Sequence, residues 1–209
     1  MTGEIPAKLF RDCRNVGTIV AIFQGCKGLT GGIPSTLFSS NTKLHRPKQA
    51  FEDCSGLNGE IPMTLFKNNP QINNMERAFY RCTNLTGVLT SEFFNTNNGR
   101  NNKIENINAI FGECPKLTGS LSDNTFRYCA SLKSADHVFY KCTGITGGIP
   151  EKLLYYCPKL ETINAMLAYC TGLGSDPDVP ATISKDFFIN NSKLHTIRSI
   201  FNNCTNISG

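Results

Sequence analysis

Apolar residues recur along the chain in an order that matches neither a regular helix nor a regular strand. The middle of each unit reads L/I-x-x-I-x-x-A/I-F-x-x-C-x-x-L, as in residues 72–85 and again in residues 104–117. The apolar positions are separated by mixed steps, whereas an amphipathic helix repeats every 3.6 residues and a half-buried strand every two. The pattern therefore predicts a coil with a short strand, corners and one or two helical turns in each unit.

A second phrase, T-G-x-I-P, opens the units. It occurs at residues 2–6, 30–34 and 146–150, with Asn in place of Thr at 58–62, and weaker copies begin at Thr86 and Thr118. Its glycine suits a turn, and its proline, which has no N–H to donate, suits the end of a short strand. We expect the strand here and about one helical turn in each L-F-x-x-[C/N] and A-F-x-x-C stretch.

The spacing of the cysteines shows that the units form one repeat series. Seven of the ten cysteines fall at positions 26, 54, 82, 114, 142, 170 and 204, in steps of 28, 28, 32, 28, 28 and 34 residues. A fixed period of this length is typical of repeat architectures, in which each unit is too short to bury its own apolar face and must stack on its neighbours. We therefore predict a repeat solenoid of about seven 28-residue units in a single domain, residues 1–209.

Two regions depart from the regular unit. Residues 97–102 and 174–180 are polar or rich in Pro and Gly, so we expect inserted loops there. Neither end of the chain carries the polar cap that usually covers a terminal repeat. We therefore expect a segment of a longer protein, or ends that are covered by neighbours.

The cysteine column predicts buried, reduced thiols, because free cysteine is among the most buried residue types. Disulfides stay an alternative, since stacked turns about 5 Å apart overlap the Cα separation of a disulfide. A metal site is the third reading, although the chain has no C-x-x-C pair. The other three cysteines share a second position with asparagines, which predicts a ladder of small polar groups against backbone. The residues at that position are Cys13, Cys129, Cys157, Asn41, Asn69 and Asn191.

The unit resembles a leucine-rich repeat, and most of all the variant found in BspA-like bacterial surface proteins. The resemblance is carried by A-F-x-x-C-x-x-L at residues 50–57, which runs into Ile61 and Pro62. The L-T-G-x-I-P phrase at residues 29–34 is also similar to plant-type leucine-rich repeats. The resemblance covers essentially the whole chain, and it implies a right-handed coil of short strands and a role in adhesion or in recognition of other molecules at a cell surface.

Composition narrows the function classes. The chain has 40% hydrophobic and 18% charged residues, and its net charge of +5 is spread without a basic run, so it reads as a folded protein that does not bind nucleic acid. No apolar stretch approaches the length of a membrane-spanning helix. The three histidines lie at different points of the unit, and no H-E-x-x-H, G-x-S-x-G or phosphate-loop motif is present. We expect no enzymatic activity, no cofactor and no metal.

Candidate binding residues lie at the variable positions on either side of the conserved Phe, since the frame residues serve stacking. Tyrosine and arginine, which are enriched at binding hot spots, gather in the units around Phe79 and Phe139. The candidates are Arg77, Tyr80, Arg81, Asp136, His137, Tyr140, Lys141 and Tyr169. The intervening unit offers the small or neutral Asn108, Ala109 and Gly112 and one acid, Glu113.

We therefore expect a strip with a shallow dip, flanked by Tyr80 and Tyr140 about 10 Å apart, two solenoid steps of roughly 5 Å. Ordinary solvated surface is the alternative reading of the same positions. The leading hypothesis is a non-enzymatic adhesion module of a bacterial surface protein, extracellular, with a protein or glycan partner on a host or neighbouring cell. The alternative is a structural or receptor-binding segment of a phage tail fibre or another large assembly, located on the virion.

Overall fold

The computed structural model describes residues 1–97, 103–176, 178–179 and 181–208. Most of the first expected inserted loop, and positions 177 and 180 of the second, lie outside these residues. The chain forms short strands joined by turns. The strands are β1 (Thr2–Glu4), β2 (Gly28–Thr30), β3 (Gly59–Glu60), β4 (Leu85–Val88), β5 (Leu117–Ser120), β6 (Ile145–Thr146), β7 (Ala181–Thr182) and β8 (Ile207–Ser208).

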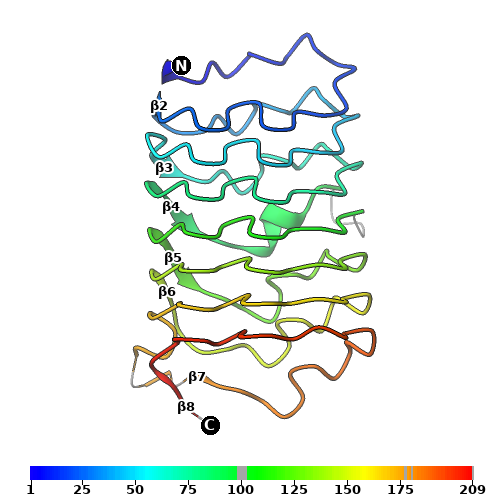
Figure 1. Ribbon diagram of the computed structural model, residues 1–209. Coiled ribbons are helices and arrows are strands. Elements are labelled where there is room, and N and C mark those ends of the chain that lie inside the picture. The colour runs from blue at the N-terminus through cyan, green and yellow to red at the C-terminus, as the bar shows by residue number, and fades with distance from the viewer. Residues whose placement is uncertain (98–102, 177, 180, 209) are drawn as a thin grey trace.

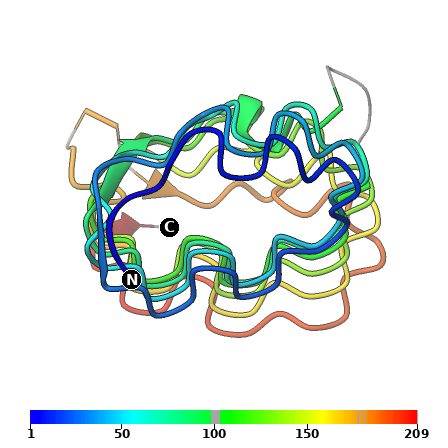
Figure 2. The same cartoon turned by 90° about the horizontal axis from the view of Figure 1, so that it is seen from above.

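All the strand pairings are parallel. β1 pairs with β2, β3 to β6 form one sheet in chain order, and β7 pairs with β8 (Figure 1). β1 to β6 overlap the T-G phrase, as expected from the sequence, whereas β7 directly follows the second expected inserted loop and carries no T-G phrase. Successive turns of the chain lie on one another, and viewed from above they superpose around an elongated outline (Figure 2).

Backbone bridges on a second side follow the sequence period. Thr18 pairs with Arg46, Asn74 with Asn106, Asn106 with Ser134, Ser134 with Thr162, and Thr162 with Thr196. These partners are separated by 28, 32, 28, 28 and 34 residues, the same steps that separate the cysteines. The two longer units therefore keep their equivalent residues in register with their neighbours.

The expected helical turns are largely absent from the described residues. They contain one 3-10 helix, η1 (Ser91–Phe94), and the other L-F-x-x-[C/N] and A-F-x-x-C stretches are hydrogen-bonded turns. The reason is visible at Arg77 and Arg81, whose φ angles are 54° and 59°. Their backbone N–H groups donate to carbonyls of the next turn, Asn108 at 2.8 Å and Gly112 at 2.9 Å. An α-helix would direct each N–H back along its own axis, so these bonds between turns exclude it.

Phenylalanine rings form two columns through the core. Phe23, Phe51, Phe79, Phe111 and Phe139 stack in sequence, with ring centroids 5.3–6.0 Å apart. A shorter column joins Phe10, Phe38 and Phe66 at 5.6 and 5.7 Å. The rings of Phe51, Phe79 and Phe111 are fully buried, which confirms these frame positions as core. The frame of the last unit is less buried, since Phe201 is half-buried and Ile197 is exposed.

Six of the seven cysteines in the column are buried and also hydrogen-bonded. Their thiols donate to the carbonyl of the frame Phe or Leu one turn earlier, at 2.9–3.0 Å, as Cys82 does to Phe51. The expected polar ladder is present too, since Asn69 Nδ2 donates to the carbonyls of Phe38 at 3.1 Å and Asn41 at 2.8 Å. Each turn is therefore tied to the previous one through side chains as well as backbone.

All ten cysteines are free, and eight are buried. The expectation of burial was wrong for Cys13, which is exposed, and for Cys26, which is half-buried, because the first turn packs against a neighbour on one side only. Burial raises the pKa of the Cys54 and Cys142 thiols to about 12. A thiolate is the reactive form of cysteine, so these groups are inert at neutral pH.

This difference predicts the outcome of a thiol titration. In the native protein, a thiol reagent should react rapidly with Cys13 and Cys26 and slowly with the other eight cysteines. In denaturant without reductant, all ten thiols should react. Peptide mapping of the first-labelled sites gives the assignment. Fewer than about eight reactive thiols in the denatured protein would contradict the reduced core.

Candidate functional site

The variable positions of the A-F-x-x-C stretch share an unusual backbone conformation. Among the described residues, thirteen other than glycine have positive φ, at the second position before or the second position after the frame Phe or, in one unit, Leu167. They include five of the eight candidates: Arg77, Arg81, His137, Lys141 and Tyr169, with φ between 54° and 63°. None of the thirteen is Val, Ile or Thr, which this conformation disfavours. The positive φ at these positions therefore disfavours side chains that branch at the β-carbon, whereas the charge and size of the side chain can vary.

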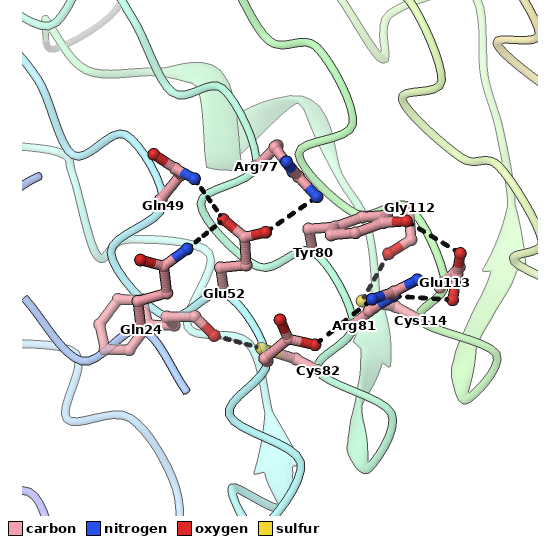
Figure 3. A network of polar contacts seen from close by, with 12 residues as sticks. Gln24, Gln49, Glu52, Arg77, Tyr80, Arg81, Cys82, Gly112, Glu113 and Cys114 are labelled. Atoms are coloured by element: carbon pink, nitrogen blue, oxygen red, sulfur yellow. Dashed lines mark hydrogen bonds and ion pairs between the residues drawn. The ribbon is translucent and has the colours of Figure 1, made fainter. Parts of the chain in front are cut away.

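Tyr80 is held in place from several sides. Its hydroxyl donates to Glu113 Oε1 at 2.9 Å, and Arg81 Nε donates to Glu113 Oε2 at 3.1 Å. The guanidinium carbons of Arg77 and Arg81 lie 4.5 and 5.0 Å from the centre of the ring (Figure 3). The ring also lies against Gly112, where a β-carbon would come within 3.0 Å of Tyr80 Cδ2. The tyrosine therefore presents a fixed surface, at little further entropic cost on binding.

A buried carboxylate holds Arg77. Glu52 is only 3% exposed, and its Oε1 accepts an ion pair from Arg77 Nη2 at 2.9 Å. Its other oxygen accepts hydrogen bonds from Gln24 Nε2 at 3.1 Å and Gln49 Nε2 at 2.7 Å (Figure 3). Glu52 directly follows Phe51, at one of the variable positions that were expected at the surface, and that expectation was wrong for this residue. Gln49 belongs to the same turn as Glu52, but Gln24 lies one turn before it and Arg77 one turn after it, so local sequence does not identify the whole network.

The second half of the strip is an aromatic cluster. The ring of Tyr140 meets Tyr169 edge-on at 5.5 Å and His137 edge-on at the same distance. Lys141 Nζ lies 5.0 Å from the centre of the Tyr140 ring and 5.9 Å from that of Tyr169. The described residues show no ion pair for Lys141, but it lines the same hollow as Glu113 and its charge helps to lower the pKa of that carboxyl.

Two neighbouring hollows lie on this strip and share Glu113. The Tyr80 hollow has a volume of about 380 Å³, and the Tyr169 hollow about 430 Å³. The first is lined by Arg77, Tyr80, Ala109, Glu113, His137 and Tyr140. The second is lined by Thr83, Glu113, Pro115, Lys141, Thr143, Tyr169 and Thr171. A depression between Tyr80 and Tyr140 is therefore present, although Tyr80 covers Gly112 and leaves Ala109 as the open position.

Two of the eight candidates, Arg81 and Asp136, line neither hollow. Arg81 is nevertheless in contact with Tyr80 and Glu113, whereas Asp136 bonds to backbone and to Asn108. The Oδ1 of Asp136 accepts the backbone N–H of Asn164 at 2.6 Å, and its own N–H donates to Asn108 Oδ1 at 2.8 Å. These bonds join three successive turns. Asp136 therefore has a structural role.

Glu113 is the functional candidate that sequence reasoning left out of its list. Partial burial works to raise the pKa of its carboxyl, but hydrogen bonds from Tyr80 and Arg81 outweigh it, and the pKa lies below its usual value. Partial burial, and then the hydrogen bond to Glu113, raise the pKa of the Tyr80 hydroxyl. Glu113 is therefore an anion at neutral pH, at the junction of the two hollows.

Comparison with known proteins gave no assignment: no protein-family model matches the chain, and no curated protein matches it. Within the described ranges, no group of three or more His, Cys, Asp or Glu side chains is placed to hold a metal ion. The same residues include no helix with the length and apolar character to cross a membrane.

Proposed function

We propose that the chain is a leucine-rich-repeat-like solenoid of the BspA-like type, a single right-handed coil that serves as a non-enzymatic binding module. Parallel pairing between turns and bridges that follow the 28-residue period support this architecture. The module acts in adhesion at a bacterial cell surface, and its partner is a protein or glycan on a host or neighbouring cell. The resemblance of the repeat, as in A-F-x-x-C-x-x-L at residues 50–57, to the repeats of BspA-like bacterial surface proteins supports a role at the cell surface.

The observation that carries the proposed function is the rigid strip of aromatic and charged side chains. Tyr80 and Tyr140 expose amphipathic rings while neighbouring charges hold them: Arg77 and Arg81 at Tyr80, and Lys141 at Tyr140. Side chains of these types dominate binding energy when they are fixed before association, because little rotamer entropy is then lost. A scaffold that lets these positions vary without changing the fold suits recognition.

Replacing Tyr80 and Tyr140 together by alanine should lower the affinity for the partner at least tenfold. Truncating one hot-spot side chain costs roughly 2 kcal/mol or more of binding free energy, which is already more than a tenfold loss of affinity, so truncating two should lower the affinity further. The labelled chain can be tested on a mammalian glycan array and on fixed epithelial cells. Tyr128→Ala combined with Tyr155→Ala is the matched control, since neither residue lines the strip hollows. Unchanged binding by a folded Tyr80/Tyr140 double variant would eliminate this surface.

A further inference from the structure

A third hollow lies away from the strip and has a different character. Its volume is about 720 Å³, and it shares no lining residue with the Tyr80 or Tyr169 hollow. It is lined by Thr42, Lys43, His45, Pro70, Gln71, Asn73 and Lys103. We propose that this basic hollow binds a sulfated glycan.

Two lysines in the basic hollow are positioned without being neutralised. Lys43 Nζ donates to the amide oxygen of Asn15 at 2.8 Å, and Lys103 Nζ donates to the amide oxygen of Gln71 at 2.6 Å. Neither lysine forms an ion pair in the described part of the chain, and no acid lines the hollow. Lys133, by contrast, pairs with Glu105 at 3.2 Å. The basic hollow therefore keeps a positive field that an anion can use.

The repeat also sets the spacing of these charges. Lys43 and Lys103 belong to turns that are separated by the turn of Gln71, so the two lysine positions lie about 10 Å apart along the stack. The ring of His45 lies against Gly17, where a β-carbon would come within 2.9 Å of His45 Cε1. The walls are thus fixed by contacts between turns, and the two charges suit anionic groups at two separate points of one ligand.

The lining favours a glycan over other polyanions. Lysine is a compact charge that binds the oxygens of an anion such as sulfate, and Thr42 and Gln71 offer neutral hydrogen-bonding groups for sugar hydroxyls. Single-stranded nucleic acid is usually bound by aromatic side chains on which bases stack, and no Phe, Tyr or Trp lines the hollow. An acidic peptide would need buried aromatic or aliphatic anchors, for which only Pro70 is present. The volume exceeds what a single small anion occupies.

The test measures binding of a fluorescent heparin hexasaccharide to the whole chain by anisotropy. Lys43→Gln combined with Lys103→Gln should weaken binding at least tenfold. Lys67→Gln combined with Lys185→Gln removes the same charge from exposed positions outside the described hollows and should change affinity less than twofold. Desulfated heparin should bind at least tenfold more weakly than heparin, and added salt should reduce the affinity.

Equal losses in the two double variants would overturn the inference, because net charge alone would then explain binding. It would also be overturned if heparin failed to bind the wild-type chain, or if a poly-glutamate peptide or an oligothymidylate bound as tightly as heparin through the same lysines. The Tyr80/Tyr140 double variant should bind heparin unchanged. This site and the strip can therefore fail independently of each other.

Discussion

Replacing Phe79 by alanine is expected to lower the free energy of unfolding by about 3–5 kcal/mol, the usual cost of truncating a buried Phe. Phe79 is fully buried and contacts Phe51, Phe93 and Phe111 at ring distances of 5.3–5.8 Å. The cavity would open in the middle of the stack, where turns on both sides hold the backbone and limit collapse. Urea denaturation followed by circular dichroism measures the change.

Tyr80→Ala is the matched control for this prediction. Tyr80 is the next residue, but it is half-buried and lies on the strip, so its loss should cost about 1 kcal/mol. If the Tyr80 variant proved less stable than the Phe79 variant, the division of the A-F-x-x-C stretch into core and surface would be inverted.

Replacing Asn69 by leucine should cost about 2–4 kcal/mol, because it leaves two buried carbonyls, those of Phe38 and Asn41, without this donor. The Asn69 side chain is fully buried, so water cannot readily replace the lost bonds. Leucine is apolar but similar in size to asparagine. The variant therefore loses the hydrogen bonds while the packing volume is largely kept. Denaturation midpoints at equal slope give the difference.

Asn69→Cys is the informative partner variant, since other turns carry Cys129 and Cys157 at this position, both buried. A thiol is a weak donor and a small group, so the cysteine variant should be more stable than the leucine variant. If the cysteine variant had the lower free energy of unfolding, the shape of the side chain, and not its ability to donate a hydrogen bond, would determine stability at this position.

The period of the sequence predicted the stacking correctly, whereas local patterns predicted the backbone poorly. Regular spacing identified the Phe, Cys and Asn columns, because equivalent residues of parallel turns must face each other. The helical turns expected around Phe79 were wrong, because the pattern A-F-x-x-C does not reveal the sign of φ. That sign follows from N–H groups that donate to the next turn, as Arg77 donates to Asn108.

The candidate site shows the same division. Sequence alone identified the variable positions and the tyrosines and arginines they hold. It could not show that Glu52 is buried beneath Arg77, or that Glu113 links Tyr80 to Arg81. Each of these contacts joins residues 25 to 33 positions apart. Partners at such distances become neighbours only when turns stack, so tertiary structure decides which charges are buried, which are paired and which remain free to bind.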